Sequence, residues 1–169
     1  MGLDHPALNQ KLASLAHRCT ELLLRQLDEQ LVSVVLFCSV ARGTAHERSD
    51  IDLFVVIQDL PAGAFARRAV VEPVHQTLQP ELDKLLRANI YTDLIEVLRT
   101  PEETGRFHLL YLDMMLDAQL LYDRDSFMES RLARVRERAD ELGTMRRQMG
   151  DVSYWDLKPD FVPGEVIAL

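Results

Sequence analysis

The sequence is poor in cysteine: it contains two, which is too few for a network of disulfide bonds. It also lacks any apolar run long enough to cross a membrane. Residues 1–10 have neither the basic start nor the apolar core of a signal peptide. We therefore expect a cytoplasmic protein that has no membrane partner.

Positive charge is also scarce, because 19 lysines and arginines stand against 27 acidic residues, which gives a net charge of −8 at pH 7. A broad nucleic-acid surface needs clustered cations to neutralise phosphates, so this composition argues against one. Arginines do gather in residues 131–147, but acidic residues at helical spacing lie among them. A solvated helix face is the simpler interpretation of this stretch, and a nucleic-acid surface is the alternative.

Several catalytic motifs are missing. The chain has no HExxH, no GxSxG and no Walker A sequence, and its five histidines are scattered singly. No constellation for a zinc protease, an elbow-type serine hydrolase or a P-loop enzyme is therefore present. With 169 residues, 47% of them hydrophobic, the chain has room for one domain with a sizeable core.

The most informative segment begins with a predicted strand and turn. An apolar run over residues 32–37 breaks at Cys38 and Ser39, and the short segment that follows ends at Arg42 and Gly43. This order predicts a strand, a tight turn and the start of a helix. Backbone N–H groups and the Ser39 hydroxyl at such a helix start form an anion site that suits the phosphates of a nucleotide.

Two carboxylates stand one residue apart where the next predicted strand, residues 51–57, begins. Alternate strand residues point the same way, so Asp50 and Asp52 are expected to share a face. The two charges repel each other, and a divalent cation with oxygen ligands, Mg²⁺ or Mn²⁺, would relieve the repulsion. The simpler alternative is a strand-turn-strand unit in which Ser49 and Asp50 serve only turn chemistry.

These residues together resemble the signature of the DNA polymerase beta-type nucleotidyltransferase superfamily, in its minimal nucleotidyltransferase branch. That signature is a glycine and serine pair, an arginine and glycine a few residues on, and Asp-x-Asp opening the next strand. One element departs, because Cys38 stands where the family has glycine, and its side chain narrows the space for phosphates. The resemblance implies the following phosphate-binding residues: Cys38, Ser39, Arg42, Gly43 and Ser49.

Cys38 itself has two interpretations. A thiol at the start of a helix tends to have a lowered pKa, which would make Cys38 reactive. The alternative is that Cys38 is a small residue tolerated in the loop.

The reaction of this superfamily uses a third carboxylate, on the strand after the Asp-x-Asp strand. Two candidates lie on a predicted strand over residues 90–98, and their odd spacing places Asp93 and Glu96 on opposite faces. We choose Glu96, because the run from Glu96 to Pro101 resembles the family's acid, four mostly apolar residues and proline. The form Asp-Leu-Ile favours Asp93 instead, and both can also be simple edge acids.

Hydrophobic periodicity predicts the remaining elements. A first helix is expected to end near Gln30, and a second, over residues 65–86, to be interrupted near Pro73 and Pro80. Two further helices are expected over residues 107–121 and 128–149.

The resemblance implies a polymerase beta-like α/β (α+β) fold, with a small mixed sheet, flanking helices, C-terminal helices and an extended tail. Within one globular domain, residues 1–103 are the expected nucleotidyltransferase core and 104–150 a helical pair packed on it. Residues 151–169 are the expected arm, which packs over the domain or across to a second subunit. The arm holds Trp155, and its sequence resembles the end of one group of prokaryotic minimal nucleotidyltransferase-like proteins.

The resemblance implies a metal-dependent transfer of an NMP from an NTP, ATP first, to an acceptor hydroxyl with release of pyrophosphate. Asp50, Asp52 and Glu96 are the expected ligands of Mg²⁺ or Mn²⁺, and Glu96 can also act as general base. An antibiotic hydroxyl, a protein tyrosine and an RNA 3′ end stay open as acceptors. The alternatives are an antitoxin-type module that binds a helical toxin-like protein, and a nucleotide-binding protein that has lost catalysis. A homodimer is compatible with each.

Overall fold

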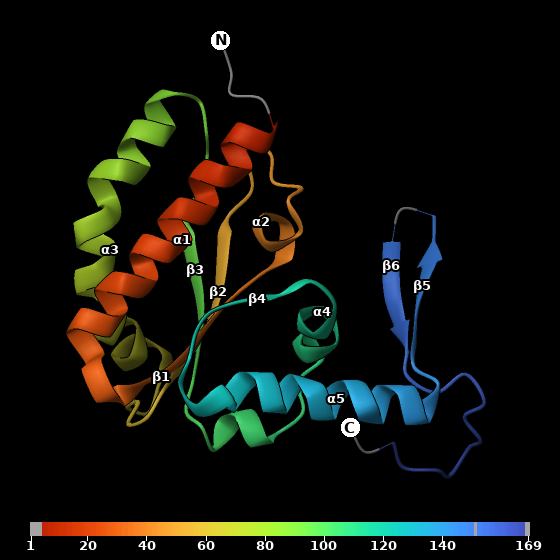
Figure 1. Cartoon of the computed structure of the whole chain (residues 1–169). Coiled ribbons are helices and arrows are strands. Elements are labelled where there is room, and N and C mark those ends of the chain that lie inside the picture. The colour runs from red at the N-terminus through yellow and green to blue at the C-terminus, as the bar shows by residue number, and fades with distance from the viewer. Residues whose placement is uncertain (1–4, 151, 168–169) are drawn as a thin grey trace.

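The computed structural model describes residues 5–150 and 152–167, with helices on both faces of a mixed four-stranded sheet (Figure 1). The strand order is β3-β2-β1-β4, where β1 is antiparallel to both neighbours and β2 is parallel to β3. The strands are β1 (Leu31–Phe37), β2 (Ile51–Ile57), β3 (Leu94–Arg99) and β4 (Gln119–Asp123). The predicted fold class is confirmed.

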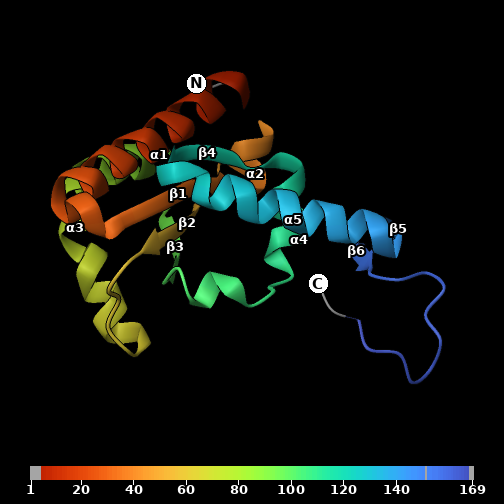
Figure 2. The same cartoon turned by 60° about the horizontal axis from the view of Figure 1, so that its bottom comes forward.

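The helices form one layer on each face of this sheet (Figures 1 and 2). They are α1 (His5–Leu27), α2 (Cys38–Arg42), α3 (Ala64–Arg87), α4 (Leu110–Asp117) and α5 (Phe127–Leu142). Short 3-10 turns cover Asp28–Gln30, Glu103–Gly105 and Arg124–Ser126. Among the residues that the structure describes, no helix is long and apolar enough to cross a membrane.

The alternation of β2 divides the core into two halves. Leu53 and Val55 pack among the apolar residues of α1 and α3, while Phe54 and Val56 pack with those of α4 and α5. Because alternate residues share a face, Asp52 lies on the same side as Phe54. The sheet therefore turns its Asp-x-Asp residues toward the α4 side and away from α1 and α3.

Helix α3 runs without a break through Pro73 and Pro80, so the predicted interruptions are wrong. A proline inside a helix costs about 3 kcal/mol, but a fully buried aliphatic side chain contributes about 1.5–3 kcal/mol. The helix buries five aliphatic side chains, namely Val71, Val74, Leu78, Leu82 and Leu85. Packing against the sheet and α1 therefore outweighs the local cost of the two prolines.

The long helix predicted to reach residue 149 ends at Leu142 instead. Gly143 adopts φ +67°, and its N–H donates to the carbonyl of Asp140, an arrangement that terminates helices. Met145–Met149 then form strand β5, which pairs with β6 (Val152–Asp156) in a two-stranded hairpin. Gly143 was the sequence signal for this end.

The helix predicted over residues 107–121 is also shorter, and its last part is a strand. Helix α4 ends at Asp117, and Gln119–Asp123 form β4, which pairs with β1 at the edge of the sheet. The predicted third strand begins at Leu94 rather than residue 90. The three apolar residues of this short segment fit a helix or a strand equally well, and pairing with the edge of β1 decided for a strand.

The β5–β6 hairpin stands away from the sheet at the end of α5 (Figure 1). Trp155 attaches it to the body of the protein, because its Nε1 donates to Asp113 Oδ1 over 3.1 Å. Residues 151, 168 and 169 of the predicted arm lie outside the described residues. The division into a core, a helical pair and an arm stays a prediction.

Candidate active site

The turn after β1 contains two residues with positive φ angles. Cys38, the first residue of α2, adopts φ +60°, in the left-handed region that favours glycine. Gly43 ends the same helix at φ +75°. The backbone at Cys38 therefore has the conformation that glycine favours, although the residue carries a side chain where glycine has only a hydrogen.

Side chains from outside the motif hold this turn in place. Asn9 Nδ2 of α1 donates to the Val40 carbonyl over 3.2 Å, and Asn9 Oδ1 accepts from the Ala45 N–H over 3.3 Å. Gln119 Nε2 of β4 donates to the Ala41 carbonyl over 2.7 Å. Sequence reasoning missed Asn9 and Gln119, because each lies on the polar side of an element and belongs to no motif.

The loop between α2 and β2 is closed by Ser49. This residue is buried, and its Oγ accepts a hydrogen bond from the His46 N–H over 3.0 Å. Arg48 N–H donates in turn to His46 Nδ1 over 3.1 Å. Ser49 therefore holds the loop that leads to the aspartates. Ser39 is half-buried, and Arg42 is exposed at the end of α2.

Asp50 and Asp52 lie close enough to influence each other. Burial raises the pKa of the Asp52 carboxyl, and the negative charge of Asp50 raises it further. A hydrogen bond from the Cys38 thiol and the positive charge of Arg42 act in the opposite direction. The pair is thus an electrostatically unfavourable arrangement that a cation would stabilise.

The third carboxylate is where the structure departs from the prediction. Glu96 is level with Leu53 of β2, so it points to the face covered by α1 and α3. Its carboxylate is buried there, with Oε1 2.7 Å from His75 Nε2, and only 2% of its side chain is exposed. The structure does not bring Glu96 together with Asp50 and Asp52.

Asp93 immediately precedes β3. It precedes Ile95, the residue level with Asp52, by two positions and therefore shares the Asp52 face. Its backbone N–H donates to Asp50 Oδ1 over 3.0 Å, and its carbonyl accepts from the Ile51 N–H over 2.9 Å. The alternative acid is the one that stands beside the aspartate pair.

Comparison with known proteins identifies the family. A family model described as the nucleotidyltransferase domain matches residues 21–113, which include the turn, both aspartates and β3. The chain belongs to this family. The family and the enzyme class predicted from the sequence are confirmed.

The nucleotidyltransferase is also similar to individual proteins. It is 28% identical over 134 residues to a Methanocaldococcus jannaschii protein provisionally named a protein adenylyltransferase, covering 79% of this chain and 84% of that one. A Sulfolobus solfataricus structure provisionally described as a nucleotidyltransferase is 20% identical, with a TM-score of 0.49, and covers 74% and 92% of the two chains. A chain in a complex of tri-AMPylated Shewanella oneidensis HEPN toxin with MNT antitoxin is 19% identical, with a TM-score of 0.44, and the match covers 76% of this chain and 87% of that one.

The carboxylates of this nucleotidyltransferase fit a hard divalent cation. Among residues 5–150 and 152–167, no three His, Cys, Asp or Glu side chains form a ready-made metal site. Mg²⁺, however, is commonly bound by one or two carboxylates together with the phosphates of a substrate. The mutual repulsion of Asp50 and Asp52 and their oxygen-only chemistry match that mode of binding.

The environment of the Cys38 thiol distinguishes between its two interpretations. Burial and the negative charge of Asp52 raise its pKa to about 11, although the charge of Arg42 opposes the shift. Burial, together with the neighbouring carboxylate, thus outweighs the effect of the start of a five-residue helix. The raised pKa therefore favours the second interpretation of Cys38, a small residue tolerated in the loop, over a reactive thiol.

Proposed function

We propose that the protein is a metal-dependent nucleotidyltransferase that transfers the NMP part of an NTP, with ATP as the first candidate, to an acceptor hydroxyl. One observation carries the proposal: burial and the negative charge of Asp50 raise the pKa of the Asp52 carboxyl at the start of β2. The phosphate turn lies at the end of β1, which is the neighbouring strand. Metal and phosphate groups would therefore meet between two adjacent strand ends.

The turn residues would hold the triphosphate. The Ser39 hydroxyl and the backbone amides of the turn are the proposed donors to phosphate oxygens. Arg42 is exposed beside them and would offset phosphate charge. Cys38 and Gly43 shape the turn through their positive φ angles, and Ser49 holds the following loop.

Asp50 and Asp52 would hold Mg²⁺ or Mn²⁺, and such an ion would stabilise the attacking and leaving oxygens of the transfer. Asp93 is the proposed third carboxylate, in place of Glu96. Its position beside Asp50 suits it to accept the proton of the acceptor hydroxyl. The acceptor oxygen would form a bond to the α-phosphorus, the bond from the α-phosphorus to the bridging oxygen would break, and pyrophosphate would leave.

The test is a double variant, Asp50→Asn with Asp52→Asn. Nucleotide with Mg²⁺ should stabilise the wild-type protein by about 2.7 kcal/mol at a concentration of about 100 times Kd. The double variant should lose this stabilisation and release no pyrophosphate from ATP. Asp59→Asn with Asp160→Asn, which removes two exposed carboxylates elsewhere, is the matched control. Unchanged stabilisation of the Asp50, Asp52 variant would refute the proposed metal site.

An antitoxin-type binding module is the second candidate, and the C-terminal hairpin favours it. Met149, Val152 and Tyr154 are 71%, 62% and 45% exposed there. An isolated two-stranded hairpin is marginally stable in water, so a protein partner would stabilise it. Co-purification of an adjacent gene's product with the Asp50→Asn, Asp52→Asn variant, and its loss with Met149→Ser and Val152→Ser, would support this function.

A further inference from the structure

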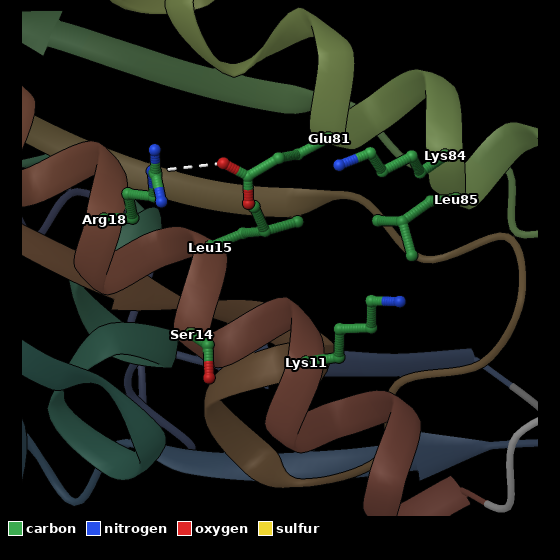
Figure 3. A pocket seen from close by; sticks show the side chains of 7 residues that line it. All are labelled: Lys11, Ser14, Leu15, Arg18, Glu81, Lys84 and Leu85. Atoms are coloured by element: carbon green, nitrogen blue, oxygen red, sulfur yellow. Dashed lines mark ion pairs between the residues drawn. The ribbon is translucent and has the colours of Figure 1, made fainter.

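A cavity of about 640 Å³ lies between α1 and α3, on the sheet face away from Asp52 (Figure 3). Its lining residues are Lys11, Ser14, Leu15 and Arg18 from α1 and Glu81, Lys84 and Leu85 from α3. This volume lies within the range of about 300–1,000 Å³ that is usual for small-molecule sites. Nothing in the proposed transfer reaction uses it.

The cavity is cationic in a protein that carries a net charge of −8. Three of its side chains are basic and one is acidic. Glu81 is already paired with Arg18, over 3.1 Å, as the dashed line in Figure 3 marks. Lys11 and Lys84 form no ion pair with any residue that the structure describes. Two ammonium groups from two different helices are therefore available to one ligand.

Besides the four charged residues, the lining holds Leu15, Leu85 and Ser14. Leu15 and Leu85 are almost completely buried, and Leu85 lies between the two lysines in the view of Figure 3. Ser14 does not add a free donor, because its hydroxyl donates to the Gln10 carbonyl over 2.8 Å. The two leucines therefore offer a ligand almost no apolar surface, and the two lysines give the cavity a positive charge that suits an anion with several phosphate groups.

We infer that this cavity binds a polyphosphate compound of about nucleotide size. Lysine binds phosphate as a compact point charge, and Lys11 and Lys84 would each contact phosphate oxygens. This site needs no metal and none of the carboxylates of the transfer site, so it is independent of the proposed function.

The experiment uses the full chain with Asp50→Asn and Asp52→Asn, in EDTA, so that the metal-dependent site is disabled. Isothermal titration calorimetry measures the binding of ATP, tripolyphosphate and adenosine. We expect ATP and tripolyphosphate to bind and adenosine not to bind. Added NaCl should weaken the binding of both phosphate compounds, because salt screens the interaction between partly exposed charges.

Variants of the cavity then locate the site. On that background, Lys11→Gln with Lys84→Gln should weaken ATP binding by about tenfold or more, since two charged contacts are lost. Arg25→Gln with Arg87→Gln is the matched control, because it removes the same charge from the same helices outside the cavity. Glu81→Gln should strengthen binding, since it removes the one carboxylate of the lining.

Three results would overturn the inference. They are no phosphate binding by the metal-free protein, equal losses in the lysine and arginine double variants, or binding of a glutamate-rich peptide but of no phosphate compound. The last result would indicate an acidic protein segment as the occupant. Circular dichroism of each variant checks that it is folded, and none of these outcomes depends on pyrophosphate release from ATP.

Discussion

At the scale of the single residue, Cys38 combines a glycine-type backbone with a side chain. A non-glycine residue in the left-handed region costs about 1–2 kcal/mol. Cys38→Gly should therefore exceed Cys38→Ala in free energy of unfolding by about 1 kcal/mol, because both lack the thiol and only alanine keeps a Cβ at φ +60°. Chemical denaturation measures the difference, and equal stabilities would show that the turn carries no strain.

The same residue gives a prediction for pH. The pKa of the Cys38 thiol is raised to about 11, so little of it is ionised at neutral pH in the metal-free protein. Alkylation by iodoacetamide in EDTA should accelerate about tenfold per pH unit as the thiolate forms. Cys19 is the internal control, because it is buried, with its pKa raised to about 12, and should stay unmodified while the protein is folded. A rate plateau near neutral pH would contradict the prediction.

The two acids of β3 should behave in opposite ways. Asp93→Asn should abolish pyrophosphate release from ATP and leave the free energy of unfolding nearly unchanged, because Asp93 is exposed. Glu96→Gln should retain transfer but lower stability by about 1–3 kcal/mol, since a buried charged hydrogen bond to His75 is weakened. Activity assays and denaturation curves of both variants decide. Loss of activity in Glu96→Gln alone would favour the original choice of third carboxylate.

At the scale of the element, one ion pair ties the start of α3 to the turn after β3. Both guanidinium Nη atoms of Arg67 donate to Glu103, over 2.8 and 2.7 Å. Glu103 Oε2 also accepts from the Thr100 N–H, and Thr100 Oγ1 accepts from the Glu103 N–H, as in a capping box. These hydrogen bonds, with that from Arg67 strongest, lower the pKa of Glu103 to about 2.

Stability should follow this shift. A carboxyl with a lowered folded pKa stabilises above its unfolded value, here 4.5, and loses that contribution as pH falls toward about 2. Glu103→Gln should therefore cost about 1 kcal/mol at neutral pH, a value limited by partial exposure to water. The cost should vanish near the lower end of that range. Glu102→Gln, an exposed neighbour, is the control, and equal effects of both variants would refute the role of the pair.

At the scale of the whole molecule, Trp155 joins the C-terminal hairpin to the body near the proposed site. Its ring packs against the half of the core formed by α4 and α5, and its Nε1 bonds Asp113. Trp155→Phe keeps most of the apolar contact but removes this hydrogen bond. Amide hydrogen exchange should then become faster in β5 and β6 and stay unchanged in β1 to β3.

Nucleotide binding should be unaffected by Trp155→Phe, because the hairpin supplies none of the proposed phosphate or metal ligands. Asp113→Asn, which keeps an acceptor for the indole N–H, is the milder comparison. Faster exchange throughout the four-stranded sheet would show that the hairpin supports the core rather than only docking on it.

The sequence by itself determined the local features. Alternation over residues 51–57 predicted the bounds of β2 and the shared face of Asp50 and Asp52, because a strand's period of two acts between near neighbours. The order of the turn and Asp-x-Asp predicted the family. The spacing of leucines likewise predicted the first helix, which ends at Leu27 and is followed by a 3-10 turn to Gln30.

Tertiary structure decided the features that depend on partners distant in the chain. The period of β3 predicts that Asp93 and Glu96 are opposed, but only the register with β2 and the cover of α3 decide which of them stands beside Asp50. In the same way, β4 is a strand because it pairs with the edge of β1. Helix α3 tolerates two prolines because its apolar side is buried. Hydrogen bonds and burial between distant segments have free energies that exceed local preferences, and a single sequence does not state which segments will meet.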